Sequence, residues 1–160
     1  CLLEKRFIVA DCGIAGEYSR EGYNHLTKYL GLFPSARYFV IGYGTNDLGE
    51  RSRTAQIEQT SKHIIDNIDK MTKELLKQSK HPLLINIPPL NSSSFSEKFA
   101  EEARKKRDYH NQRLNQYCTQ RNIPLVDICS VLKDEDFADS LHPNKAGAKL
   151  IAIEVYKLIK

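Results

Sequence analysis

Two short polar segments carry side chains whose types and spacing suit acid–base chemistry. In the first, Asp139 stands three residues before His142, and a proline and an asparagine follow. A carboxylate bonded to one ring nitrogen fixes the imidazole tautomer and leaves the other nitrogen to act as a general base. Histidine suits this task because its ordinary pKa, about 6.5, lies near neutral pH. The alternative is structural, since Asp and Asn also cap helix starts.

The second segment is a glycine-rich loop that contains Gly44-Thr45-Asn46-Asp47. The Asn46 side-chain amide could donate a hydrogen bond to the oxyanion that develops during acyl transfer. An ordinary turn explains the same residues, because Gly, Asn and Asp all tolerate tight-turn backbone. The loop lacks the GxxxxGK[ST] pattern of phosphate loops. The dinucleotide pattern GxGxxG is incomplete both here and around Gly13-Ile14-Ala15-Gly16.

Alternating apolar runs and helical patterns predict how these segments are positioned. Continuous apolar strands that alternate with helices of about ten or more residues imply a parallel sheet covered on both faces. Ligands bind such sheets outside the carboxyl ends of the strands, which is where both polar segments lie. The sequence therefore predicts the α/β class in one domain, residues 1–160. Strands are expected at 7–10, 38–41, 83–87 and 124–128, and helices at about 22–32, 57–75, 96–121 and from 144.

Composition narrows the classes of partner. No apolar run reaches the roughly 18 residues of a membrane span, so no integral membrane segment is expected. The net charge is only +4, and the densest basic cluster, Arg104-Lys105-Lys106-Arg107, follows Glu101 and Glu102. This pattern is typical of a solvated helix face with local charge pairing, so no nucleic-acid partner is expected.

The four cysteines, Cys1, Cys12, Cys118 and Cys129, form neither a CxxC motif nor a dense disulfide framework. Cys12 and Cys129 flank strand-like runs and are expected to be buried thiols. This favours a reducing compartment such as the cytoplasm. An N-terminal signal cannot be judged from a chain that starts at Cys1.

Together, and in the same order along the chain, these segments resemble the sequence blocks of the SGNH (GDSL) hydrolase family. Gly44-Thr45-Asn46-Asp47 resembles the block GxND, and Asp139-Ser140-Leu141-His142-Pro143-Asn144 resembles the C-terminal block DxxHPN. The stretch from Asp11 to Ser19 resembles the second block, N-x-x-x-x-G-x-T/S-S, with Gly16 as its glycine. The resemblance extends over residues 7–160.

This resemblance implies a flavodoxin-like three-layer α/β/α sandwich with a parallel sheet of strand order 2-1-3-4-5. It also implies a carboxylester hydrolase, an esterase or lipase. Asp139 and His142 would be the acid and base of a Ser-His-Asp arrangement, and Gly16 and Asn46 would supply the oxyanion donors. Neither a metal nor an organic cofactor is implied. The substrate would be a small-molecule, carbohydrate or lipid ester, or a thioester.

One family block has no counterpart in these residues: the G-D-S block that carries the nucleophilic serine at the end of the first strand. Ser19 and Ser140 are nearby hydroxyls, but neither occupies the nucleophile position. The domain is therefore expected to be N-terminally incomplete, with the serine and the first strand upstream. The alternative is a non-catalytic binding module that has lost its nucleophile.

The missing strand would lie between residues 7–10 and 38–41. Unpaired buried strand edges are costly, so one of three arrangements is expected to fill the gap. An upstream segment complements the sheet, a second copy donates a strand in a homo-oligomer, or Phe7-Ala10 pairs directly with Tyr38-Ile41.

Overall fold

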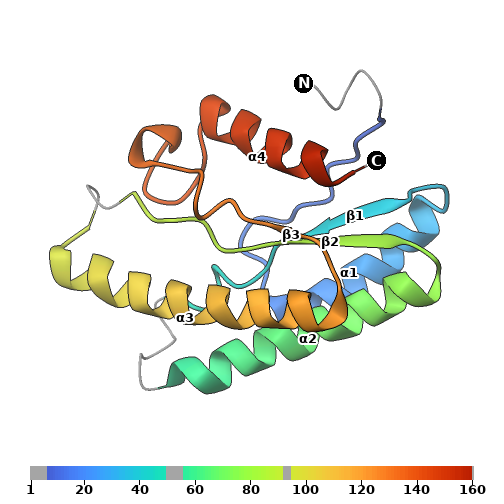
Figure 1. The fold of residues 1–160 in the computed structure, drawn as a ribbon, viewed down its shortest axis with the longest axis horizontal. Coiled ribbons are helices and arrows are strands. Elements are labelled where there is room, and N and C mark those ends of the chain that lie inside the picture. The colour runs from blue at the N-terminus through green and yellow to red at the C-terminus, as the bar shows by residue number, and fades with distance from the viewer. Residues whose placement is uncertain (1–6, 50–55, 92–94, 160) are drawn as a thin grey trace.

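The computed structural model describes residues 7–49, 56–91 and 95–159, and Figure 1 shows their arrangement. Within these described ranges, three strands and four α-helices alternate, with one short 3-10 helix before the last α-helix. In chain order these elements are α1 (Ser19–Leu32), β1 (Tyr38–Ile41), α2 (Ile57–Lys77), β2 (His81–Ile85), α3 (Glu97–Arg121), β3 (Leu125–Val126), η4 (Asp134–Asp136) and α4 (Lys145–Leu158).

The three strands form a parallel sheet in the order β1-β2-β3. Tyr38 lies opposite His81, and Leu84 lies between Ile41 of β1 and Leu125 of β3. A long helix connects each pair of neighbouring strands, as parallel pairing requires. All three strands therefore end at the same edge of the sheet.

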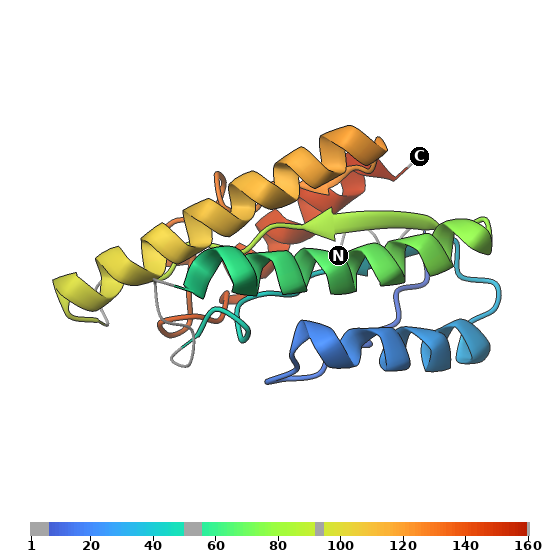
Figure 2. The same ribbon diagram turned by 90° about the horizontal axis from the view of Figure 1, so that it is seen from below.

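Helices cover both faces of this sheet. Figures 1 and 2 show α1, α2 and α3 on one face and α4 on the other. Successive strand residues point to opposite faces, so Leu84 joins the buried cluster beneath α1, α2 and α3, and Leu83 joins the cluster beneath α4. The predicted α/β class and three-layer sandwich are confirmed.

Several predicted elements keep their type but change their bounds. The first helix starts at Ser19, earlier than expected, and the Glu21 carboxylate accepts the Tyr18 N–H at 2.9 Å at its first turn. The strand expected to end at Ile87 stops at Ile85. The Ile87 N–H donates to Asn111 Oδ1 at 2.9 Å, and Asn111 Nδ2 donates to the Ile87 carbonyl at 2.8 Å. The backbone of Ile87 therefore bonds to α3 and not to a strand.

The strand predicted at Phe7-Ala10 is absent, and this prediction is wrong. These residues are not assigned to any strand, Ile8 is fully exposed and Val9 is mostly exposed. Phe7 touches the sheet through an edge-to-face contact with Tyr38, with ring centroids 6.3 Å apart. The apolar run favours a buried strand, but among the described residues no strand pairs with it. Direct pairing of Phe7-Ala10 with β1 is thereby contradicted.

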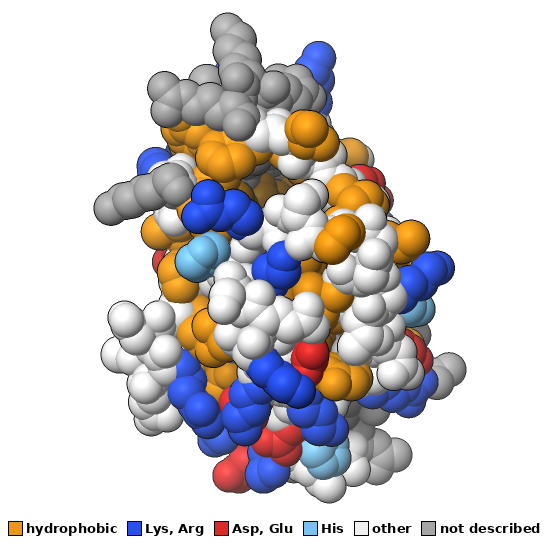
Figure 3. Space-filling view, turned by 90° about the vertical axis from the view of Figure 1, so that its right-hand side faces the viewer, with side chains coloured by type: hydrophobic (Ala, Val, Ile, Leu, Met, Phe, Trp, Pro, Cys, Tyr) orange, Lys and Arg blue, Asp and Glu red, His pale blue; other side chains and the backbone are white. Residues whose placement is uncertain are grey.

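Consequently β1 is an edge strand among the described residues, and Val40 in its middle is 47% exposed. Figure 3 views the end of the molecule at which α1 ends and β1 begins, and it shows apolar side chains open to solvent among charged ones. An uncovered, apolar strand edge is a site at which a further strand can add. The large apolar side chains exposed on or near this region include Ile8, Val9, Leu32, Phe33 and Val40.

The cysteines differ from the composition-based expectation, whereas the basic cluster agrees with it. Cys12 and Cys129 are half-buried, not buried as expected, whereas Cys118 is buried and its burial raises its pKa to about 11. In the basic cluster, Lys105 pairs with Glu101 at 2.6 Å and Lys106 approaches Glu102 at 3.7 Å, as expected for local charge pairing. Of the described helices, none is long and apolar enough to cross a membrane.

Candidate active site

Asp139 and His142 lie on the loop between η4 and α4. The Asp139 Oδ2 atom is 2.8 Å from His142 Nδ1. Its Oδ1 atom accepts the backbone N–H groups of His142 and Leu141, both at 2.7 Å. These backbone bonds, followed by the bond from the His142 ring, lower the pKa of Asp139 to about 2. The carboxylate thus holds Nδ1, and Nε2 is the ring nitrogen that can accept a proton.

Asn144 anchors the end of this loop. Its Oδ1 accepts the N–H groups of Ala146 and Gly147, at 2.8 and 3.1 Å, so it is the N-cap of α4. Its own N–H donates to the Asp136 carbonyl at 2.8 Å. Gly147 permits this approach, because a Cβ there would lie 2.3 Å from the Asp136 carbonyl oxygen. The capping interpretation therefore holds for Asn144, while Asp139 binds the histidine.

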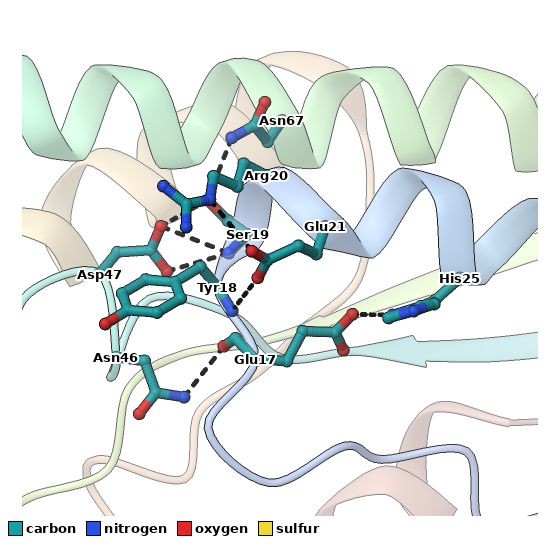
Figure 4. A network of polar contacts seen from close by, with 9 residues as sticks. All are labelled: Glu17, Tyr18, Ser19, Arg20, Glu21, His25, Asn46, Asp47 and Asn67. Atoms are coloured by element: carbon teal, nitrogen blue, oxygen red, sulfur yellow. Dashed lines mark hydrogen bonds and ion pairs between the residues drawn. The ribbon is translucent and has the colours of Figure 1, made fainter.

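The loop after β1 meets the turn before α1 at the two predicted oxyanion donors. Asn46 Nδ2 donates to the Glu17 carbonyl at 2.9 Å (Figure 4). Gly16, which precedes Glu17, has a φ of +76°. It lies in a turn in which the Glu17 N–H donates to the Ile14 carbonyl at 3.3 Å. Because one amide hydrogen of Asn46 is held in this way, its second N–H has a fixed direction.

Ser19, one of the two hydroxyls weighed as a substitute nucleophile, is fully buried at 0% exposure. Its Oγ donates to Asp47 Oδ1 at 2.7 Å and accepts from Asn67 Nδ2 at 3.1 Å (Figure 4). Its backbone N–H also bonds to the Asp47 carboxylate, at 3.1 and 3.3 Å. The hydroxyl is thus occupied in fastening α1 to α2 and to the loop after β1.

Sequence reasoning did not single out Asp47 and Asn67 for this role. Asp47 is the neighbour of Asn46 in the GxND-like segment, which is the one signal that points to it. Asn67 lies on α2, where nothing in the helical pattern separates it from other polar residues. By fastening Ser19, these two residues help to position the Gly16 turn against the Asn46 loop.

Polar contacts also fasten the loops that leave β2 and β3. Asn86 Nδ2 donates to Asp127 Oδ1 at 2.6 Å, and Asn86 Oδ1 accepts the N–H groups of Ile128 and Cys129. Beyond β2, the Asn91 N–H donates to the Ser140 carbonyl at 3.1 Å. This bond ties the loop after β2 to the loop that carries His142.

A second histidine, His110, lies under the loop after β1. It is fully buried, and its Nδ1 lies 3.0 Å from Ser61 Oγ on α2. Its Nε2 has no hydrogen-bond partner among the described residues and faces Gly44, where a Cβ would lie 3.3 Å away. Desolvation, with a smaller contribution from Arg113, lowers the pKa of His110 to about 4, so the ring is neutral near pH 7.

Of the four residues predicted for the site, Asp139 and His142 contact each other, and Asn46 contacts Glu17, the residue that follows Gly16. Asn46 follows the carboxyl end of β1, and Asp139 comes after β3. In parallel sheets these ends share one edge, which is the usual ligand-binding edge. Within the part of the chain that the structure describes, no group of three or more His, Cys, Asp or Glu side chains could hold a metal ion.

Solved structures share this fold. A GDSL-like lipase from Bacteroides thetaiotaomicron is 20% identical, with a TM-score of 0.69 over 91% of this chain and 72% of that one. An acetyl xylan esterase is 15% identical, with a TM-score of 0.73 over 98% and 83% of the two chains. The psychrotrophic esterase EstA from Pseudoalteromonas sp. is 20% identical, with a TM-score of 0.65 over 98% and 82%. At these identities the likeness shows the fold alone.

Comparison of the sequence itself with known families and proteins identifies the family. No curated protein matches this chain. The sequence profile of the GDSL-like Lipase/Acylhydrolase family, however, matches residues 2–150, almost the whole length. That match spans the Gly16 turn, the Asn46 loop and the loop of Asp139 and His142. The chain therefore belongs to the GDSL-like lipase/acylhydrolase family.

Proposed function

We propose that the protein is a carboxylester hydrolase that acts by a Ser-His-Asp mechanism. The observation that carries the proposal is the 2.8 Å contact between Asp139 Oδ2 and His142 Nδ1. This contact orients the imidazole so that Nε2 can act as a general base toward a serine hydroxyl. It occurs in a family of acylhydrolases, on a loop at the ligand-binding edge of the sheet.

In the proposed reaction, the serine oxygen attacks the ester carbonyl carbon while His142 Nε2 takes the hydroxyl proton. The Gly16 N–H and the Asn46 Nδ2–H stabilise the tetrahedral oxyanion, and loss of one such donor typically costs about 2.7–4 kcal/mol of barrier. The carbon–oxygen bond to the alcohol then breaks, and His142 returns the proton to the departing alkoxide. Water, activated by His142, hydrolyses the acyl-enzyme to the carboxylic acid and free serine.

We further propose that the nucleophilic serine lies on a segment upstream of Cys1, because residues 1–6 contain no serine. Ser19 is buried and its hydroxyl is bonded on both sides, so it cannot attack a substrate without breaking the network that fastens α1. One edge of β1 has no partner strand among the described residues, and the Ile8 side chain is exposed, which supports a place for one more parallel strand. The carboxyl end of such a strand would lie at the same sheet edge as His142.

The substrate class that we propose is a small ester of the carbohydrate or lipid type. Support comes from the family, which is one of lipases and acylhydrolases, and from structural neighbours described as a lipase, an esterase and an acetyl xylan esterase. The same fold hosts different ester substrates, so a panel of acetylated sugars, short acyl esters and lysophospholipids identifies the class.

The test compares residues 1–160 with the protein translated from the whole coding sequence, using p-nitrophenyl acetate. The extended protein should show a burst of p-nitrophenol that His142→Ala abolishes, because a general base needs its nucleophile to form an acyl-enzyme. Residues 1–160 alone should hydrolyse the ester no faster than their own His142→Ala variant. A burst from residues 1–160 that Ser19→Ala removes would overturn the proposal. An extended protein that binds esters without turnover would support a binding module instead.

A further inference from the structure

A nearly buried carboxylate stands beside the proposed oxyanion donors. The Glu17 side chain is only 7% exposed, and partners approach both of its oxygens. Tyr43 OH donates to Oε2 at 2.9 Å, and His25 Nδ1 bonds to Oε1. Figure 4 shows His25 reaching Glu17 from α1, and Tyr43 belongs to the loop after β1. The carboxylate therefore joins the helix to this loop.

The backbone of Glu17 adjoins both proposed oxyanion donors. Its carbonyl accepts the Asn46 Nδ2–H at 2.9 Å, and its peptide nitrogen follows directly on Gly16. A displacement of Glu17 would therefore move both proposed donors at once. Catalytic groups lose much of their effect when they shift by about 1 Å, so a fixed Glu17 has direct consequences for rate.

The Tyr43 ring is packed closely enough to hold the Glu17 carboxylate in place. It lies against Gly22 of α1, where an added Cβ would lie 2.6 Å from a ring carbon. Burial, and next the bond to Glu17, raise the pKa of Tyr43 well above its ordinary value. The phenol thus stays a hydrogen-bond donor at all pH values in which the protein would work. A hydrogen bond from a neutral donor to a carboxylate is stronger than one between two neutral groups.

We propose that Glu17 is the positioning residue of the oxyanion hole, held by Tyr43 and His25. The inference rests on the proposed function and deepens it, because Glu17 occupies a position that the block pattern N-x-x-x-x-G-x-T/S-S leaves unspecified. Glu17 acts through the Gly16 and Asn46 donors and does not touch the ester. Tyr43 and His25 set its side chain, and its backbone sets the Asn46 amide.

The kinetic test uses the protein with its nucleophile-bearing segment. Tyr43→Phe should lower kcat about tenfold with little change in KM, because misaligned donors weaken stabilisation of the transition state more than binding of the ester. Glu17→Gln keeps an oxygen acceptor for the Tyr43 hydroxyl and should retain most of kcat, whereas Glu17→Ala should not. The matched control is Tyr117→Phe, which removes a 3.0 Å bond from a buried tyrosine on α3 to a carboxylate on α2, Asp69. This control should leave kcat unchanged.

A second measurement does not depend on activity. The side-chain amide resonances of Asn46 should shift in Tyr43→Phe and stay in place in Tyr117→Phe. If Tyr43→Phe does not fold, His25→Ala provides a second variant. It removes the other side-chain partner of the Glu17 carboxylate, at a more exposed position, and should shift the same resonances. Unchanged Asn46 resonances and an unchanged kcat in Tyr43→Phe would overturn the inference while leaving the proposed function intact. Shifted resonances in a protein that hydrolyses no ester would refute the proposed function and uphold the structural link.

Discussion

The Asp139 carboxylate holds His142 at two points, by the backbone and by the ring. Oδ1 accepts the His142 backbone N–H at 2.7 Å, and Oδ2 lies 2.8 Å from Nδ1 of the same residue. Both side chains are exposed, at 55% and 75%, so the ring is oriented by this four-residue loop and not by packing. The ring of His142, the proposed base, is thus oriented without help from a substrate.

Because these bonds favour the charged carboxylate, Asp139 should titrate near pH 2, below the ordinary value of about 3.9. A lowered folded pKa contributes stability above the unfolded pKa, and this contribution is lost as the pH falls through the folded pKa. The loop should therefore keep its structure down to about pH 3. A side-chain carboxyl NMR titration measures the midpoint.

The His142→Ala variant separates the causes of this shift. Its backbone N–H, the largest cause, remains in place, so the Asp139 pKa should rise only part of the way to its ordinary value. A midpoint near 4 in the wild type would show that the loop does not hold the carboxylate as described.

Asp139→Asn should lower kcat by roughly 10⁴-fold in the protein that carries its nucleophile, because an amide favours the wrong imidazole tautomer. The KM should change little, since the residue does not bind the ester. Steady-state hydrolysis of p-nitrophenyl acetate measures both constants. Asp66→Asn, which removes an exposed carboxylate paired with Lys62 on α2, is the matched control and should be silent. An equal loss in both variants would refute the role of Asp139.

Burial of neutral His110 makes stability depend on pH. Its folded pKa of about 4 lies below the ordinary value, so the unfolded chain binds the proton first as the pH falls. The free energy of unfolding should drop between about pH 6.5 and 4, by on the order of 3 kcal/mol from this residue. Urea denaturation at several pH values measures the slope.

The matched variants for that slope are His110→Gln and Ser61→Ala. His110→Gln should flatten it, because the titrating ring is gone. Ser61→Ala removes the 3.0 Å partner of His110 Nδ1 and should lower stability while the slope remains. The same slope in wild type and His110→Gln would contradict the assignment.

Gly147→Ala should destabilise the protein by about 1–3 kcal/mol, the usual cost of overpacking. The added Cβ would lie 2.3 Å from the Asp136 backbone oxygen, which cannot move without displacing the loop that bears His142. Thermal unfolding measures the effect. Gly31→Ala, at a helical position with no atom within 4 Å of the added Cβ, should instead stabilise by about 0.5–1 kcal/mol. Equal shifts in both variants would rule out the close contact.

Local pattern was enough to predict some elements and not others. The helix α2 was predictable because Ile64, Ile68, Met71 and Leu75 recur on one face, and all four are buried. The GxND-like and DxxHPN-like segments were predictable because each lies within a few consecutive residues. Phe7-Ala10 was mispredicted because its pairing depends on a partner strand and not on its own apolar character.

The polar supports of the site lay beyond sequence reasoning for a related reason. Tyr43 and Glu17 are 26 residues apart, and Asn67 and Ser19 are 48 residues apart. No periodicity or spacing marks such pairs, because helix packing brings them together. From its sequence context, Glu17 cannot be told from an ordinary surface carboxylate. In the structure its side chain is nearly buried between α1 and the loop after β1.

The most direct test of the whole account is covalent labelling of the protein from the complete coding sequence with a fluorophosphonate, followed by peptide mass spectrometry. Such a probe phosphonylates a serine only where a base and an oxyanion hole activate it. We expect one labelled serine, on a peptide upstream of Cys1, with labelling abolished by His142→Ala and weakened by Asn46→Ala. Labelling of Ser19 or Ser140, or labelling that persists in His142→Ala, would contradict it.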